Sequence, residues 1–128
     1  MNKNLAITSF LGFLAVVLGA FATHSLKDTL TKDAYASLQT AIRYQIYHVL
    51  VVLFVNLYSG FSSALKNKLS VLFFIGILFF SGSIYTIYLG GVPAKSIWFI
   101  TTLGGLILCL GWLWMVGVFL KKGLQKGA

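Results

Sequence analysis

The sequence contains very few acidic residues, one proline and one cysteine. Asp28 and Asp33 are the only carboxylate side chains among 128 residues, and 9% of the chain is charged. A single cysteine, Cys109, excludes an intramolecular disulfide framework and a CxxC metal or redox pair. Because Cys109 lies inside an apolar run, we interpret it as a small packing residue.

Hydrophobic residues, in contrast, are abundant. They make up 59% of the chain, and the mean hydropathy is +0.92. Both values are far above those of soluble globular domains, so the chain belongs in a bilayer. Since each crossing takes about 20 residues, there is room for four helices and short connections, but not for a soluble catalytic domain.

Four apolar runs are each long enough to cross a hydrocarbon core about 30 Å thick. They lie at about 5–26, 37–59, 69–89 and 97–120. We predict an all-α membrane protein, a four-transmembrane-helix bundle that forms one domain over residues 1–128. Thr31 or Asp33 is expected to cap the second helix, and GVPAK to form the turn before the fourth.

Three of the four runs contain small residues at positions where helices could pack closely. The first run resembles a secretory signal, with Lys3, an apolar stretch and small residues at 20 and 22. Against cleavage, a stripe suited to close packing in lipid recurs at intervals of three and four: Gly12, Ala15, Gly19 and Ala22. We therefore expect the first helix to be retained. Glycines in the last two runs are also expected to let helices approach closely: Gly76, Gly82, Gly104, Gly105 and Gly111.

The basic residues act as topology signals. The net charge is +8, but the lysines stand in small groups at the ends of apolar runs rather than in one patch, so we expect no nucleic-acid partner. Six lysines fall on one side of a four-span chain: Lys3, Lys66, Lys68, Lys121, Lys122 and Lys126. Three fall on the other side: Lys27, Lys32 and Lys95. This asymmetry predicts that both termini are cytoplasmic.

The second run carries unusual polarity in the stretch TAIRYQIYHVL, residues 40–50. On a helical wheel its polar side chains gather on one side: Ser37, Thr40, Tyr44, Gln45, His48, Asn56 and Ser59. Arg43 and Tyr47 lie at the border. Because polar groups facing lipid are costly, this face is expected to look into protein or a wet cavity.

Depth along the helices suggests which residues meet. Arg43 lies about 9 Å from the outer end of its span, as do Ser83 and Tyr85, and the two threonines at 101 and 102 lie slightly shallower. The candidate ligand-binding residues are His24, Arg43, Tyr44, Gln45, Tyr47, His48, Ser81, Ser83, Tyr85, Thr101 and Thr102. They are expected to form an outer-half polar pocket for an anionic lipid headgroup or a small ligand.

In this hypothesis Arg43 pairs with the anion, Tyr44 and Gln45 orient it, and His48 senses or relays a proton. A plainer interpretation stays open: Arg43 snorkels to the headgroups, and the other side chains are hydrogen-bonded contacts between helices.

The sequence also bears on other functions. A small transporter would lack the membrane carboxylate that drug exporters use, because no Asp or Glu lies in a span. A histidine-based or purely facilitative route stays open, so a small transporter or channel-like protein is an alternative. Haem held by His24 and His48 is disfavoured by a height difference of roughly 13 Å. A structural role, as a homo-oligomer or a subunit of a larger membrane complex, remains an alternative. We expect no enzymatic activity, no cofactor and no metal, and membrane lipid as the partner.

Four segments resemble a known family. GAFATHSL, TAIRYQIYHVLVVL, FFSGSIYTIYLGG and ITTLGGLILCLGW appear in the order found in DUF423 (UPF0382), a family of small four-span, transmembrane protein 256-like membrane proteins. The RYQ-x-YH block and the histidine-leucine ending of the first span are its most specific parts. The chain departs from the pattern at Ala22 and Thr23, where glycine-alanine is expected, and at Thr102, where proline is common. The resemblance implies four spans, an uncleaved first helix and a place in the bacterial plasma (inner) membrane, but no substrate.

Overall fold

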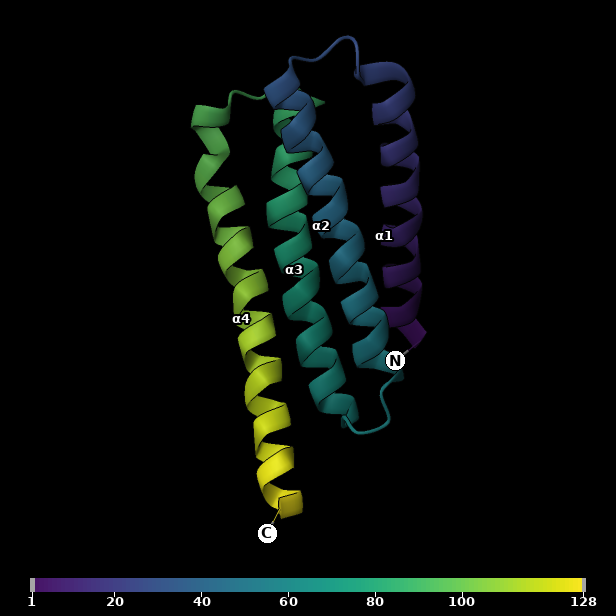
Figure 1. The fold of residues 1–128 in the computed structure, drawn as a ribbon, viewed down its shortest axis with the longest axis vertical. Helices are drawn as coiled ribbons and strands as arrows, with labels where there is room; N and C mark the ends of the chain where they lie inside the picture. Colours follow the sequence, from purple (N-terminus) through teal and green to yellow (C-terminus); the bar gives the residue numbers. More distant parts are fainter. Residues whose placement is uncertain (1, 128) are drawn as a thin grey trace.

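Helices account for nearly all of the structure. The computed structural model describes residues 2–127, and this range contains no strand. The four long helices are α1 (Asn2–Phe21), α2 (Lys32–Leu57), α3 (Ser63–Tyr88) and α4 (Ala94–Gly127), and a π-helical turn, η1 (Ala22–Leu26), extends α1. Successive helices run in opposite directions side by side (Figure 1). The predicted all-α four-helix bundle is confirmed.

All four helices are long and apolar enough to cross a membrane. The mean hydropathy of their most apolar windows ranges from 1.3 for α2 to 2.3 for α1 with η1. Of these windows, 44% and 39% are buried in α2 and α3, but only 17% and 22% in α1 and α4. α2 and α3 are therefore the inner helices, whereas α1 and α4 leave most of their surface to lipid.

Capping residues, rather than the apolar runs, decide where α2 and α3 begin. The Thr31 hydroxyl accepts a hydrogen bond from the Ala34 amide at 3.1 Å, and the Ser62 hydroxyl accepts one from the Leu65 amide at 3.2 Å. Of the two caps expected for the second helix, Thr31 is the one used. Both helices therefore start ahead of the apolar runs predicted from residues 37 and 69.

The small-residue stripe of α1 packs against α2, as expected. Ala15 and Ala22 are buried, and a methyl group added at Gly12 would touch the Val49 side chain at 3.4 Å. Apolar residues of α2 are buried at this contact as well, among them Ile42 beside Gly19. α2 is thus covered by α1 on its apolar side and by α3 on its polar side.

Glycine also brings α4 close to α3. A Cβ at Gly104 would collide with the backbone of Phe80, and one at Gly111 would lie 2.7 Å from the Phe73 ring. The buried residues of α4 recur at spacings of four, three and four: Gly104, Leu108, Gly111 and Met115. The expectation that these glycines permit close approach is confirmed at both positions.

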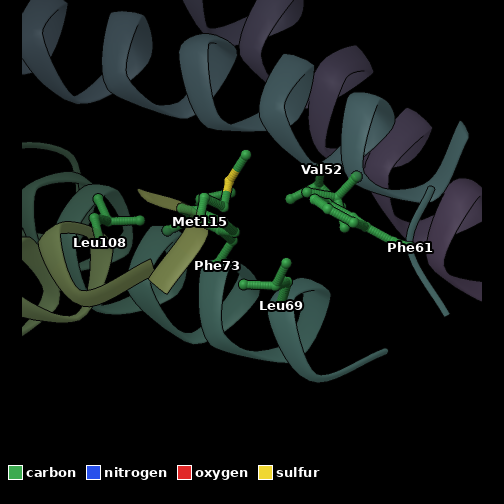
Figure 2. Close-up of a cluster of buried hydrophobic side chains, with 8 residues drawn as sticks. Val52, Phe61, Leu69, Phe73, Leu108 and Met115 are labelled. Atoms are coloured by element: carbon green, nitrogen blue, oxygen red, sulfur yellow. The ribbon is translucent and has the colours of Figure 1, made fainter. Parts of the chain in front are cut away.

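The main apolar core lies where α2, α3 and α4 meet. It comprises Val52, Val55, Phe61, Leu69, Phe73, Ile77, Leu108 and Met115, most of which Figure 2 labels. Phe61 belongs to the connection between α2 and α3 and is 4% exposed. The connection therefore packs back onto the bundle.

The two ends of the bundle differ in charge. Both ends of the described chain lie in the lower half of Figure 1, as does the α2–α3 connection. We call this the lysine-rich end, because it holds Lys3, Lys66, Lys68, Lys121, Lys122 and Lys126. The opposite end, the aspartate end, holds Asp28 and Asp33 with Lys27, Lys32 and Lys95.

Candidate functional site

Arg43 lies on the exposed side of α2, in the half nearer the aspartate end. Exposed residues recur down this side at spacings of four and three: Arg43, Tyr47, Leu50, Phe54 and Leu57. Within residues 2–127, no hydrogen bond or ion pair joins the Arg43 guanidinium to another side chain or to the backbone. The Arg43 guanidinium thus faces away from the bundle.

Two exposed tyrosines follow Arg43 on α2. Tyr44 and Tyr47 are 43% and 51% exposed, and their ring centroids lie 5.9 Å apart. Tyr44 also stacks on Phe80 of α3, with ring centroids 5.1 Å apart, which fixes the position of its ring. We call Arg43, Tyr44 and Tyr47 the Arg43 patch.

Gln45 points to the other side of α2 and joins three helices. It is 3% exposed, its amide nitrogen donates to the Leu11 carbonyl of α1 at 2.7 Å, and its amide oxygen accepts from the Tyr85 hydroxyl of α3 at 2.7 Å. A cavity of about 330 Å³ lies beside it between α1 and α3, lined mainly by aliphatic side chains such as Leu14 and Leu18. Both ends of the Gln45 amide are therefore committed to helix contacts.

His48 connects α2 to α4. Its Nε2 lies 3.0 Å from the indole Nε1 of Trp112, and its Nδ1 lies 2.6 Å from the Tyr44 carbonyl oxygen. An indole N–H can only donate, so Nε2 must be the acceptor and Nδ1 must carry the proton that is donated to Tyr44. His48 is thus neutral in this arrangement, and both ring nitrogens are occupied.

The remaining candidates divide between two groups. Ser81 donates to the Ala41 carbonyl of α2 at 2.7 Å, and the hydroxyls of Ser83 and Thr101 lie 2.5 Å apart between α3 and α4. His24 and Thr102 are exposed and lie apart from these contacts. Ser83 and Thr101, which were predicted to lie at similar depth, are in contact. Arg43 takes no part in this contact.

The structure therefore does not bring the eleven predicted residues into one cavity. The Arg43 patch is exposed, while the other group makes separate contacts between helices and comprises the buried Gln45, His48, Ser81 and Ser83 with the half-buried Tyr85 and Thr101. Within residues 2–127, no cluster of three His, Cys, Asp or Glu side chains is placed to hold a metal ion.

A polar cluster at the lysine-rich end was missed by the sequence analysis. The Asn4 amide of α1 donates to the oxygens of Asn56 at 3.2 Å and Asn67 at 2.9 Å, which belong to α2 and α3. Asn56 in turn donates to the Ser70 hydroxyl at 2.8 Å, and its carbonyl accepts from the Lys66 ammonium at 2.9 Å. These polar residues lie at similar depth from the same face of the bilayer, and this shared depth was the sequence signal that could have linked them.

Trp112 was also missed as a partner of His48, since no pattern within the sequence links the two residues. The relevant signal was chemical. A histidine buried near mid-membrane requires hydrogen-bond partners for two ring nitrogens, and tryptophan is the apolar residue that offers an N–H donor.

Four spanning helices, held by buried hydrogen bonds and close glycine contacts, define a small multi-pass membrane protein. The model of the family described as "Protein of unknown function (DUF423)" matches residues 18–105. The chain belongs to this family, as the four sequence segments suggested.

Relatives match this chain over most of its length. The chain is 39% identical to a UPF0382 membrane protein of Haemophilus influenzae, over 96% of this chain and 98% of the relative. It is 42% identical to one of Staphylococcus epidermidis, over 84% and 87%. Identity to the UPF0382 inner membrane protein YgdD of Escherichia coli is 32%, over 91% and 87%. No solved structure matches the chain. The protein is placed in the bacterial plasma (inner) membrane as a multi-pass protein.

Proposed function

We propose that the protein is a non-enzymatic membrane protein that binds the headgroup of an anionic lipid at the Arg43 patch. One observation carries the proposal. Arg43 is exposed on a membrane-spanning helix, and no described residue offers it an anion or a hydrogen-bond acceptor.

A guanidinium held in hydrocarbon without a partner is costly. Arg43 lies about 9 Å inside the predicted span, which its long side chain can cross to reach the headgroup region. There a phosphate can accept two parallel N–H bonds from the planar guanidinium. Such a pair would offset the cost of keeping the charge at this depth.

The two tyrosines supply further groups to such a ligand. The hydroxyls of Tyr44 and Tyr47 make no hydrogen bond within residues 2–127, so both can donate to phosphate or glycerol oxygens. The stacking of Tyr44 on Phe80 holds one of these rings in place before binding.

The buried polar residues have a supporting role in this proposal. Gln45 and His48 use their polar atoms to join α2 to α1, α3 and α4, so they fix the rotation of α2 about its axis. That rotation decides which way Arg43 points. We infer that these residues position the Arg43 patch and do not contact the ligand, and that the bundle binds rather than catalyses.

Replacing Arg43 by Leu tests the proposal. The parent should retain an anionic phospholipid in native mass spectra of gently purified protein, and Arg43→Leu should lose it. Charge-assisted hydrogen bonds contribute about 1.5–3 kcal/mol, so binding should weaken by at least roughly tenfold. Arg43→Lys keeps the charge without the paired donors, and it should bind with intermediate affinity.

Thermal unfolding with added phosphatidylglycerol gives a second measurement. The lipid should stabilise the parent by mass action, and it should stabilise Arg43→Leu much less. Equal lipid retention and equal stabilisation in both proteins would leave Arg43 as a snorkelling residue. A change of oligomeric state with unchanged lipid binding would favour a structural subunit instead.

A further inference from the structure

A second groove lies at the lysine-rich end, far along the bundle from the Arg43 patch. Its volume is about 520 Å³. One wall is formed by Tyr58 and Gly60 of the α2–α3 connection, and the other by Phe119, Lys122 and Lys126 of α4. The groove therefore combines aromatic rings with two cations.

The length of α4 creates this groove. α4 has 34 residues, whereas α2 and α3 have 26 each, so α4 projects beyond its neighbours at the lysine-rich end (Figure 1). Phe119, Lys122 and Lys126 are separated by three and four residues, which places them on one face of α4. That face looks onto the α2–α3 connection.

The aromatic part of the groove is well packed. The Tyr58 ring contacts Phe54, Phe61 and Phe119, with centroid distances of 5.4, 4.8 and 5.8 Å. Gly60 has no side chain to interfere, and a methyl group there would overlap the Tyr58 ring. The Tyr58 hydroxyl makes no hydrogen bond within residues 2–127, which leaves it able to donate to a ligand.

The lysines that line the groove have no carboxylate side chain at their own end of the bundle to pair with. Both carboxylate side chains of the sequence, Asp28 and Asp33, lie at the aspartate end. Neither can neutralise Lys122 or Lys126, which line the groove from the other end of the bundle.

The depth of the lysines matches that of a phospholipid headgroup. Lys122 follows Trp98 by 24 residues along α4, a rise of about 36 Å. If Trp98 lies at one edge of a hydrocarbon core about 30 Å thick, Lys122 lies just beyond the other edge, among the phosphates. Phe119 then lies at the level where acyl chains begin.

We propose that this groove binds the headgroup phosphate of an anionic phospholipid from the leaflet at the lysine-rich end. Lys122 and Lys126 contact the phosphate, the Tyr58 hydroxyl donates to the headgroup, and Phe119 packs against the first part of an acyl chain. The site is independent of the Arg43 patch, and it does not depend on which side of the membrane the lysine-rich end faces.

A matched pair of double variants tests the proposal. Lys122→Gln with Lys126→Gln removes both cations of the groove, and Lys3→Gln with Lys121→Gln removes the same charge from the same end outside it. Each protein is reconstituted in nanodiscs of phosphatidylethanolamine and titrated with phosphatidylglycerol, and bound lipid is counted by native mass spectrometry.

We expect the groove variant to bind phosphatidylglycerol roughly 30-fold more weakly, from the loss of two lysines near the anionic headgroup. The control variant should bind like the parent, and Tyr58→Phe should show a smaller loss than the groove variant. Thermal unfolding in phosphatidylethanolamine alone should be the same for all of them, because these side chains lie at the surface. Arg43→Leu should keep this lipid, which separates the two sites.

Three results would overturn the proposal. Equal weakening in both double variants would reduce the effect to the general attraction of lysines for an anionic surface. Undiminished binding in the groove variant would remove these lysines from lipid binding and favour an acidic protein partner. Equal stabilisation of the parent by inorganic phosphate and by phosphatidylglycerol would identify a site for free phosphate.

Discussion

At the scale of single residues, close backbone contact is the most sensitive feature of this bundle. Lipid tails are as apolar as leucine, so helices in a bilayer associate largely through van der Waals packing and buried hydrogen bonds. Gly104 is the tightest point, because its Cα faces the backbone of Phe80. A backbone neighbour cannot move aside as a side-chain end can.

Replacing Gly104 by Ala should therefore force α4 away from α3. Overpacking of this kind costs about 1–3 kcal/mol, and we expect a lower unfolding temperature in detergent. Gly117→Ala is the matched control on the same helix, since nothing lies within 4 Å of an added methyl group there. The control should be as stable as the parent or more so, because alanine favours the helix over glycine by about 1 kcal/mol. Similar unfolding temperatures for both variants would contradict the close contact.

His48 shows a limit of residue-level reasoning. Its place on the polar side of α2 was correctly derived from the helical wheel, yet its partner Trp112 lies 64 residues away on α4. Only the packed structure brings the two rings together, and with them the tautomer of the imidazole becomes defined.

At the scale of the helices, α2 is the centre of the bundle. α1 covers one of its sides, α3 another, and α4 reaches it through Trp112, while the side with Arg43 remains exposed. The sequence separated an apolar from a polar side but could not show that part of each side would be buried. The wheel describes directions around one axis and carries no information on how many neighbours surround it.

α1 offers a test of this arrangement. Ala15 is 1% exposed against α2, whereas Ala20 is exposed on the same helix. Ala15→Leu should lower the free energy of unfolding by about 1–3 kcal/mol. Ala20→Leu adds the same atoms on the exposed side and should change it by less than about 0.5 kcal/mol. Chemical unfolding in mixed micelles measures both, and equal effects would mean that α1 does not pack through its small-residue stripe.

At the scale of the whole molecule, charge separates the two ends. The lysine-rich end has six lysines and no carboxylate side chain, and the aspartate end has three lysines and two aspartates. Since positive residues are retained in the cytoplasm, we predict that the lysine-rich end and both termini face inward.

Accessibility labelling tests this orientation. In a Cys109→Ser background, a cysteine at position 95 should react with an impermeant maleimide on intact spheroplasts, and one at position 68 should not. Both should react after permeabilisation, which is the control for exposure, since Lys68 and Lys95 are exposed. Labelling of both positions in intact spheroplasts would contradict the predicted topology.

The sequence by itself determined the number of spans, the helical class and the side of α1 that packs inward. These follow from rules that act along the chain: about 20 apolar residues for each crossing, and small residues where helices touch. Tertiary structure decided how the polar residues divide. The tilt and rotation of neighbouring helices placed Gln45 against Leu11 and Tyr85, His48 against Trp112, and Asn56 among Asn4 and Ser70. They left Arg43 outside these contacts, because a side chain's partner depends on the orientation of other helices, which no single helical pattern contains.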